Sequence, residues 1–431
     1  MNFARLNHIL IPARRDDRER LRRGLLARVS TPVWWLYAAL SEEGRVLSVL
    51  MLFIGTASLA IDTTQIYVLW SVLAGLLVGG LIVRRAFHLR DVSLEVRAPH
   101  RVAVGEPTTF EVTLRHSGSL PVHDVRVAGP FLPWDGRWLG VGPSVACIPV
   151  GGSARTELRA TFVARGEHSL DVFGAARLVP GGLARGPAIA SGSVRFLVVP
   201  VIAKVARLAF PPGFSGLYGA RTRGGERAAR LEFFAVRPYR PGDSLRSLHS
   251  KTWARRGVPH VREYRDAASL RLGVILDDDP RSASEAAYEA GLSIVAGIVA
   301  HACRAAVVVD GLVLGAHFHT LGGPCGGGLL EEALDRLATA VRDGATDRRG
   351  FWTAREAWLR QLSMVVVVST GPDSRRRELL SELVRRRLTV RVVRVFDERS
   401  WRGAIAVPPP LSLAESVVPV GSLTDPKGLV L

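Results

Sequence analysis

The sequence contains few cysteines and almost no lysine. Its three cysteines, Cys147, Cys303 and Cys325, lie far apart and form no C-x-x-C pair, which argues against a disulfide framework or a zinc ribbon. All but three of the 57 lysine and arginine residues are arginine, and they are spread along the whole chain. The net charge of +18 therefore looks as much like a composition bias as a binding surface. Because no nucleic-acid reader motif accompanies it, we expect no nucleic-acid partner.

Several catalytic signatures are also missing. The chain has no H-E-x-x-H metalloprotease helix, no G-x-S-x-G nucleophile elbow and no phosphate loop ending in G-K-[ST]. Each of these motifs places a catalytic group or an anion cradle at a defined position in the fold. Their absence leads us to expect a protein that is not an enzyme.

Two long apolar runs stand out near the N-terminus. They cover 46–61 and 66–83 and are separated by the polar break at 62–65. Each approaches the roughly 17 to 25 residues that a helix needs to cross a bilayer. Neither run has the polar stripe that a helix packed on a soluble core would show. We therefore predict a transmembrane helical hairpin at 46–85.

Arginine predicts the orientation of this hairpin. A basic arm, 1–45, precedes the first run, and Arg84, Arg85 and Arg90 follow the second, while the short loop between them has no basic residue. The positive-inside rule places both ends in the cytoplasm. We expect a two-pass protein of the inner membrane with cytoplasmic main domains. Membrane lipid is then a partner, and the segment with Trp34, Trp35 and Tyr37 is expected at the headgroup interface.

The hydrophobic pattern of the sequence changes after the transmembrane hairpin. From 91 to 200, short segments alternate apolar and polar residues with a period of two, separated by Gly, Pro and Ser. This pattern predicts an immunoglobulin-like β-sandwich. From 270 to 400, buried strands alternate with helices, which predicts a doubly wound α/β domain. We expect an irregular tail at 401–431.

In a doubly wound sheet, ligands bind beyond the carboxyl ends of the strands. Polar residues follow three predicted strands: Asp277 to Asp279 after the first, Asp310 after the second, and Ser369 and Thr370 after the third. Their oxygen atoms are candidate ligands for Mg²⁺. The alternative is a carboxylate cluster that caps the following helix and is paired with arginine.

The segment 201–269, which connects the two domains, has the most specific motif. Its candidate partner-binding or structural residues are Glu232, Phe233, Arg237, Tyr239, Gly242, Asp243, Arg246 and Arg255. The Pro-Gly-Asp sequence at 241–243 is typical of a turn, and the aspartate can cap the helix predicted after it. The arginines can hold the carboxylates in bidentate pairs. These residues form either an ion-pair network that fixes a loop or a docking surface for a partner.

The run from Arg230 to Asp277 resembles the bacterial domain of unknown function 58 family. That family has the approximate signature E-F-x-x-x-R-x-Y-x-x-G-D-x-x-R-x-I-x-W-x-x-x-A-R. The order of membrane helices, β-sandwich and α/β module extends the resemblance over nearly the whole chain. It implies a von Willebrand factor A-like α/β domain and association with a MoxR-type AAA+ ATPase, and it implies no established enzymatic activity.

The chain departs from this family at two places. Ser250 stands where the signature has tryptophan. A metal-ion-dependent adhesion site would resemble D-x-S-x-S after the first strand, but here Asp279 and Arg281 follow Asp277 at the serine positions. We therefore expect no cofactor, and Mg²⁺ held by Asp277 and Asp279 is the alternative.

The sequence thus predicts a membrane-anchored, non-enzymatic adaptor or scaffold. Its cytoplasmic part would dock a MoxR-type AAA+ ATPase for the assembly or remodelling of a client protein. The alternative function is a Mg²⁺-dependent ligand-binding receptor of the von Willebrand factor A type.

Overall fold

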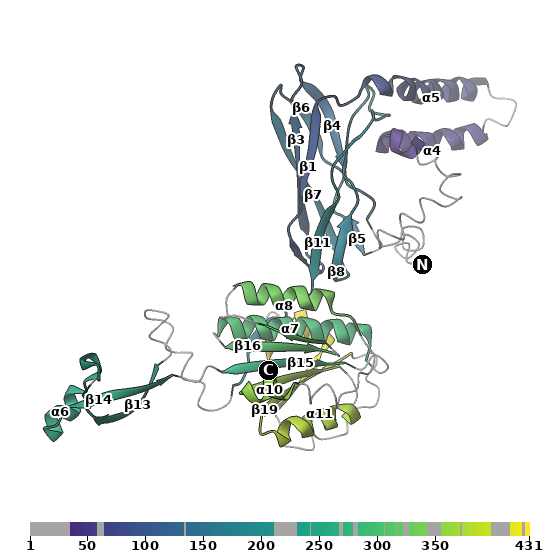
Figure 1. Cartoon of the computed structure of the whole chain (residues 1–431). Helices are drawn as coiled ribbons and strands as arrows, with labels where there is room; N and C mark the ends of the chain where they lie inside the picture. The colour runs from purple at the N-terminus through teal and green to yellow at the C-terminus, as the bar shows by residue number, and fades with distance from the viewer. Residues whose placement is uncertain are drawn as a thin grey trace. The chain divides into compact units, whose positions relative to one another are not determined.

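The computed structural model describes residues 35–57, 64–132, 135–210, 231–241, 243–266, 270–278, 283–305, 307–315, 317–321, 327–342, 355–370, 373–397, 414–424 and 427–431. These residues belong to two compact units, Met1–Val199 and Pro200–Leu431. Each unit has a hydrophobic core of its own. The elements of both units are labelled in Figure 1.

The first unit begins with two helices that lie side by side, α4 (Glu42–Ala57) and α5 (Thr64–Val83) (Figure 1). They approach closely at Gly55, where an added Cβ would lie 2.9 Å from the indole nitrogen of Trp70. Apolar side chains of α5 point outward, and Val68 and Ile82 are 60% and 71% exposed. An apolar surface of this extent calls for apolar surroundings.

Two helices among the described residues are long and apolar enough to cross a membrane. One is Tyr67–Ala86, of which 6% is buried, and the other is Glu285–Arg304, of which 67% is buried. The second is a core helix of the second unit, because most of its surface is already covered by protein. The polar break predicted at 62–65 is shorter than expected, since Thr64 and Gln65 already belong to α5. Residues 1–34, including Trp34, and 58–63 lie outside the described part.

A β-sandwich follows the helices. One sheet has the strand order β1-β3-β7-β5 and the other β10-β9-β4-β6, and a third sheet has the order β2-β11-β8. The strands are β1 (Val92–Arg97), β2 (Arg101–Ala103), β3 (Thr108–His116), β4 (Val122–Ala128), β5 (Gly136–Trp138), β6 (Ser144–Ile148), β7 (Ser153–Phe162), β8 (Gly166–Leu170), β9 (Gly174–Arg177), β10 (Ile189–Ala190) and β11 (Val194–Val199).

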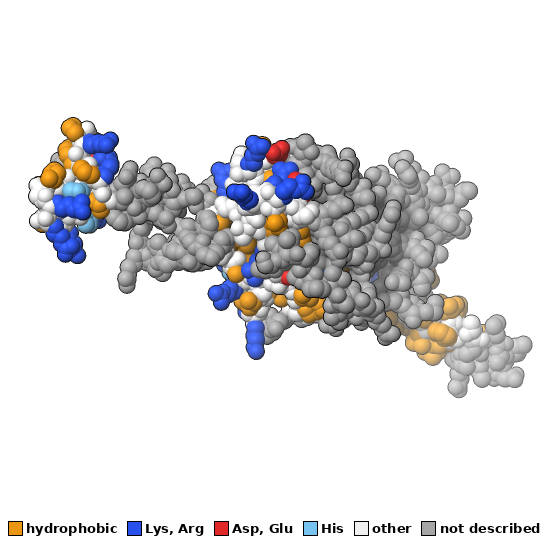
Figure 2. Space-filling model, turned by 90° about the horizontal axis from the view of Figure 1, so that it is seen from below, with side chains coloured by type: hydrophobic (Ala, Val, Ile, Leu, Met, Phe, Trp, Pro, Cys, Tyr) orange, Lys and Arg blue, Asp and Glu red, His pale blue; other side chains and the backbone are white. Residues whose placement is uncertain are grey.

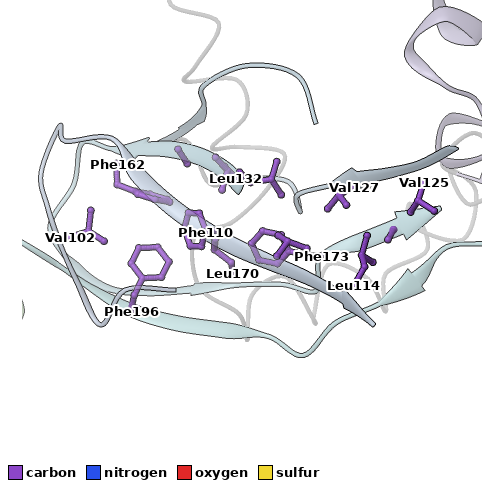
Figure 3. Packing of buried hydrophobic residues seen from close by; sticks show 14 of the residues in the cluster. Val102, Phe110, Leu114, Val125, Val127, Leu132, Phe162, Leu170, Phe173 and Phe196 are labelled. Carbon is purple, nitrogen blue, oxygen red and sulfur yellow. The ribbon is translucent and has the colours of Figure 1, made fainter. Parts of the chain in front are cut away.

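Alternation of side chains builds the sandwich core. In β3 every second residue is buried, so that Phe110, Val112 and Leu114 face inward. Phe110 lies among other rings, with centroids 5.7 Å from Phe173 and 5.6 Å from Phe196 (Figure 3). Aromatic packing at such separations adds to the burial of apolar area. The period-two pattern of the sequence is thus an accurate guide to this core.

The second unit is an α/β sheet of six strands in the order β17-β16-β15-β18-β19-β20. Its strands are β15 (Arg271–Asp277), β16 (Val308–Leu314), β17 (His317–Thr320), β18 (Met364–Ser369), β19 (Thr389–Phe396) and β20 (Ala414–Pro419). All pairs are parallel except β16 with β17, which forms an antiparallel edge. The first strand of this sheet in sequence order, β15, therefore lies in the middle, as in doubly wound folds.

Helices cover both faces of this sheet. The helices α7 (Glu285–Arg304) and α8 (Gly327–Thr339) lie on one face, and α10 (Glu356–Gln361) and α11 (Asp373–Arg385) lie on the other (Figure 1). Leu359 of α10 and Leu383 of α11 are buried against Val365 and Val367 of β18. Coverage on both faces explains why all six residues of β18 are buried.

Two sequence-based expectations for this unit are wrong. The second strand was expected to end before Asp310, but it runs from Val308 to Leu314, because the apolar run after Gly311 continues the pairing with β15. The tail expected to be irregular provides β20 to the sheet edge, and its end, β21 (Leu429–Val430), pairs with β12 (Val205–Arg207). Both departures reflect long-range strand pairing, which local sequence does not encode.

Candidate functional site

The signature segment forms a β-hairpin with a helical tip. Strands β13 (Leu231–Pro238) and β14 (His260–Asp266) pair antiparallel, and between them lie the 3₁₀ turn η5 (Leu245–Ser247) and helix α6 (Ser250–Arg256). The pairing places Arg237 opposite Val261, and the N–H of Tyr239 donates to the carbonyl of Pro259 at 2.9 Å. The loop after β13 is therefore held at its base by backbone hydrogen bonds.

An arginine fork fixes this loop. Arg237 donates through Nη1 and Nη2 to the two carboxylate oxygens of Asp243 at 2.8 and 2.7 Å. The backbone N–H of Arg240 donates to the same carboxylate at 2.8 Å. The Arg237 guanidinium and this N–H hold the pKa of Asp243 below its usual range, because each stabilises the charged form. The fork closes the loop from Pro238 to Asp243 into a defined shape.

The predicted role of Asp243 as a helix cap is wrong. Its carboxylate accepts from the loop N–H of Arg240 instead, since α6 begins only at Ser250. The cap of α6 is His249, whose ring Nδ1 accepts from the N–H of Thr252 at 3.3 Å. Gly257, with φ of 68°, ends the helix in the left-handed conformation that glycine adopts without strain.

The remaining signature residues fall into two groups. Glu232 and Phe233 lie in β13, opposite Arg265 and Tyr264, and the placement of their side chains is outside the described part, as is Gly242. Arg246 and Arg255 are exposed, and their side chains make no hydrogen bond or ion pair with any described residue. Of the eight signature residues, only Arg237 and Asp243 are seen to contact each other through their side chains in the described part of the hairpin.

Exposed basic and apolar side chains share the surface of the helical tip. Trp253 of α6 is 45% exposed and Val258 just after it is 53% exposed. Lys251 and Arg256 are exposed on the same short helix. Blue basic and orange hydrophobic side chains are interspersed on the hairpin at the left of Figure 2. An exposed tryptophan surrounded by cations is typical of a contact surface for an acidic partner.

A second cluster lies where three sheet strands end. Asp278 follows β15, and its carboxylate accepts from the Thr370 hydroxyl after β18 at 2.6 Å. Arg342, just after α8, donates to the same carboxylate through Nε at 2.7 Å and Nη2 at 3.1 Å. The Nη2 group also donates to the carbonyl of Ala283 at 2.7 Å. The Asp278 side chain is 4% exposed, so the guanidinium neutralises a buried carboxylate.

Asp278 and Tyr288 both stabilise the charge of Arg342. Hydrogen bonding to Asp278 raises the pKa of Arg342. The guanidinium carbon also lies 5.3 Å from the centre of the Tyr288 ring, close enough for a cation–π contact. Nearby, Ser284 caps α7 by accepting from the N–H of Ala287 and donates to Asp397 after β19 at 3.0 Å. The carboxylates of Asp278 and Asp397 at this edge of the sheet thus accept hydrogen bonds from protein donors.

The structure bears differently on each predicted metal ligand. Asp279 lies outside the described residues, and Asp277 is the last residue of β15. Asp310 is not at this edge: it lies inside β16, and its carboxylate is 3.7 Å from the guanidinium of Arg271 at the start of β15. The described residues contain no group of three His, Cys, Asp or Glu that could hold a metal ion. Asp278 is paired with arginine, as in the alternative to a metal site.

Arg342 is the residue that sequence reasoning missed. It is 64 residues from Asp278 in the chain, and no local motif marks it among the many arginines. The edge position of Thr370 was recognised from its place after the third strand. The available signal was the position of Asp278 directly after a buried strand, since a carboxylate buried there requires a cation.

No protein-family model matches this chain, and no curated protein matches it. Solved structures similar to a part of it include the CARDB domain of the PF1109 protein from Pyrococcus furiosus, crystallised with di-metal ions, at 17% identity over 26% of this chain and 91% of that one, with a TM-score of 0.18. AvmM, which catalyses macrocyclization in alchivemycin A biosynthesis, is 12% identical over 25% of this chain and 88% of its own, with a TM-score of 0.19. Native alpha-2-macroglobulin from Escherichia coli is 12% identical over 34% and 22%, with a TM-score of 0.20.

Proposed function

We propose that this protein is a membrane-anchored, non-enzymatic adaptor of the bacterial inner membrane. Helices α4 and α5 cross the bilayer, and both main units are cytoplasmic. The signature hairpin docks a MoxR-type AAA+ ATPase, which acts on a client protein held near the membrane. The α/β unit is a von Willebrand factor A-like domain, and the chain is a relative of the domain of unknown function 58 family.

The helices support the membrane anchor. Most of the exposed side chains of α5 from Tyr67 to Val83 are apolar, and the arginines at 84 and 85 come directly after the helix. Apolar helices flanked by arginine orient with the arginine in the cytoplasm. Helix α4 has 16 residues; it begins with Glu42 and Glu43 and is mainly apolar from Val46 to Ala57. Together they form the two crossings of the proposal.

Sheet topology supports the proposed domain type. If the strands of the sheet are counted along the chain from β15, their order is 3-2-1-4-5-6, with the third antiparallel at one edge. This order agrees with the doubly wound arrangement that the family resemblance implies. Arg342 on Asp278 supports a domain that works without a metal ion, because the guanidinium already neutralises the buried carboxylate.

The single observation that carries the docking proposal is a fixed loop beside unpaired cations. The Arg237–Asp243 fork shapes the loop, while Arg246 and Arg255 are exposed without a partner among the described residues. Because the fork already fixes the loop, less backbone entropy is lost when a partner binds. Positive charge also steers an acidic partner toward the surface.

The test is a crosslinking pull-down of the full chain from detergent-solubilised membranes of the cells that make it. Wild type is compared with the double variant Arg246→Ala plus Arg255→Ala. The matched control is Arg360→Ala plus Arg385→Ala, which removes two arginines whose side chains are 77% and 73% exposed on α10 and α11. Each arm is run in Mg²⁺ and in chelator.

The proposal predicts that wild type and control capture an AAA+ ATPase and that the signature variant captures several-fold less. Nucleotide is left out of all arms. Under this condition, chelator in the crosslinking buffer should not change the amount of ATPase that the adaptor captures. Equal capture by the signature variant would move docking away from the hairpin. Capture of a ligand that disappears in chelator would favour the Mg²⁺-dependent receptor, and capture of no ATPase by wild type would refute the adaptor.

A further inference from the structure

The two membrane helices are fixed to the sandwich by the β9–β10 loop, residues 178–188. The N–H of Ser41 donates to the carbonyl of Leu183 at 3.0 Å, and the N–H of Arg185 donates to the carbonyl of Ala39 at 2.7 Å. Gly44 of α4 lies so close that an added Cβ would be 2.0 Å from the carbonyl oxygen of Leu183. The loop and the base of α4 therefore pack backbone against backbone.

Four arginines surround this junction, and we call them the arginine collar: Arg45, Arg84, Arg126 and Arg185. Arg45 and Arg84 lie at the ends of α4 and α5 that meet the sandwich, and Arg126 and Arg185 lie on the sandwich itself. The Nε of Arg84 donates to the carbonyl of Arg185 at 3.1 Å. Positive charges from both helices and from the sandwich thus lie together at the junction between them.

Two aromatic rings lie against the arginines of the collar. The guanidinium of Arg45 lies 3.6 Å from the centre of the Tyr37 ring, and that of Arg84 lies 5.1 Å from the Trp35 ring. Both rings remain exposed, at 41% and 54%. Tryptophan and tyrosine prefer the headgroup region of a bilayer. Each ring also holds its arginine by a cation–π contact.

The collar has more positive charge than its carboxylates neutralise. Arg126 is paired, since its Nη1 lies 3.1 Å from both carboxylate oxygens of Glu43. The Nε of Arg185 is buried and has no hydrogen-bond partner among the described residues. Burial lowers the pKa of Arg185, and so do the nearby charges of Arg45 and Arg126, while the carboxylates of Glu42 and Glu43 act in the opposite direction. A buried N–H of a guanidinium without an acceptor is costly, and an anion that accepts from it would remove that cost.

We propose that the arginine collar binds the phosphate of an anionic phospholipid headgroup, with Arg185 as its central contact. This inference rests on the proposed membrane anchor, which places the helix ends at the cytoplasmic leaflet. Guanidinium groups match phosphate oxygens in a bidentate geometry. Basic pockets beside transmembrane helices on the cytoplasmic side are suited to anionic headgroups. A lipid bound there would join the helices to the sandwich and fix its position at the bilayer.

The test is lipid titration of the delipidated full chain in detergent, followed by native mass spectrometry. Phosphatidylglycerol is compared with phosphatidylcholine of the same acyl chains. We expect phosphatidylglycerol to bind more tightly to wild type and Arg185→Gln to weaken it roughly five-fold, the factor for one basic side chain at an anionic surface. Arg185→Lys should retain most of the preference. The control Arg159→Gln, on the exposed face of β7, should bind like wild type.

Three outcomes would overturn the proposal. The first is equal affinity for the two lipids, and the second is unchanged affinity of Arg185→Gln while its thermal unfolding matches that of wild type. The third is full competition by inorganic phosphate at the concentration of the lipid, which would identify a soluble anion as the ligand. Carbonate extraction of membranes tests the anchor separately. A chain that resists extraction but shows no lipid preference contradicts only the collar.

Discussion

The molecule uses the same arginine–aspartate fork in two regions with different surroundings. Arg237 holds Asp243 at 2.7 and 2.8 Å in the signature hairpin, and Arg342 holds Asp278 at 2.7 and 3.1 Å at the sheet edge. The Asp243 side chain is 20% exposed, whereas that of Asp278 is 4% exposed. Burial strengthens the attraction and also raises the cost of losing either partner. We infer that the sheet-edge fork supports the fold and the hairpin fork shapes a surface.

Removing the buried fork should have the largest effect. Arg342→Ala leaves the Asp278 carboxylate with the Thr370 hydroxyl as its described side-chain donor. Breaking a buried pair in this way costs about 3 to 5 kcal/mol. Hydrogen exchange of the full chain in detergent should show faster exchange in peptides from β15 and β18, because their local opening becomes easier.

A double variant separates the charge from the packing. Asp278→Asn combined with Arg342→Ala removes the uncompensated carboxylate, so its exchange in β15 and β18 should be slower than that of Arg342→Ala alone. With Asp278→Asn measured alone as well, the coupling between the two side chains is the effect of the double variant minus the sum of the two single effects. If the double variant exchanges as fast as the single variant, the guanidinium stabilises the edge by its contacts with Tyr288 and Ala283 instead.

Removing the exposed fork should have a smaller and more local effect. Arg237→Ala frees the loop after β13, and cleavage by proteinase K between 238 and 249 should become several-fold faster in the full chain. Arg237→Lys keeps the charge but cannot form two parallel hydrogen bonds, so its cleavage rate should lie between the other two. Wild-type rates for Arg237→Ala would mean that the backbone hydrogen bonds of Tyr239 and His249 suffice to hold the loop.

Acid should loosen the hairpin fork by the same mechanism. The pKa of Asp243 is lowered in the folded chain by Arg237 and the N–H of Arg240. Its contribution to stability is therefore complete above the unfolded pKa of about 3.9 and is lost as pH falls through the lower folded value. After correction for intrinsic rates, exchange of the Arg240 amide should accelerate over that window. Asp243→Asn should show no such acceleration.

The two forks also differ in how far the sequence predicts them. Arg237 and Asp243 are six residues apart and flank a turn, so their pairing follows from local geometry. Arg342 and Asp278 are 64 residues apart and meet because β15 and α8 belong to one fold. The sequence identified Asp278 and Thr370 through their places after strands. It could not select their cation, because arginines occur throughout the chain.

The same distinction applies to the elements of the fold. The strands Met364–Ser369 and Thr389–Phe396 lie in the region predicted to be α/β, because their apolar residues pack into the core: all of β18 is buried, and β19 mixes buried with partly exposed residues. The hairpin of β13 and β14 was not predicted as strands, since its charged residues leave no clear period. Strand β20 was missed because its place depends on pairing with β19. Local patterns therefore predict elements with a buried face, and tertiary pairing determines the rest.

The smallest effect on local stability is expected at an exposed arginine–carboxylate pair that lies within one helix and does not fix a loop. Arg360 of α10 donates to Glu356 one turn earlier at 2.7 Å, and its side chain is 77% exposed. Solvent screens such a pair, and both side chains lose freedom when they meet. Arg360→Ala should leave both the exchange of β18 and the cleavage of the signature loop at wild-type rates. A clear change in either would show that pair geometry alone stabilises this chain, and burial would then no longer explain the difference between the two forks.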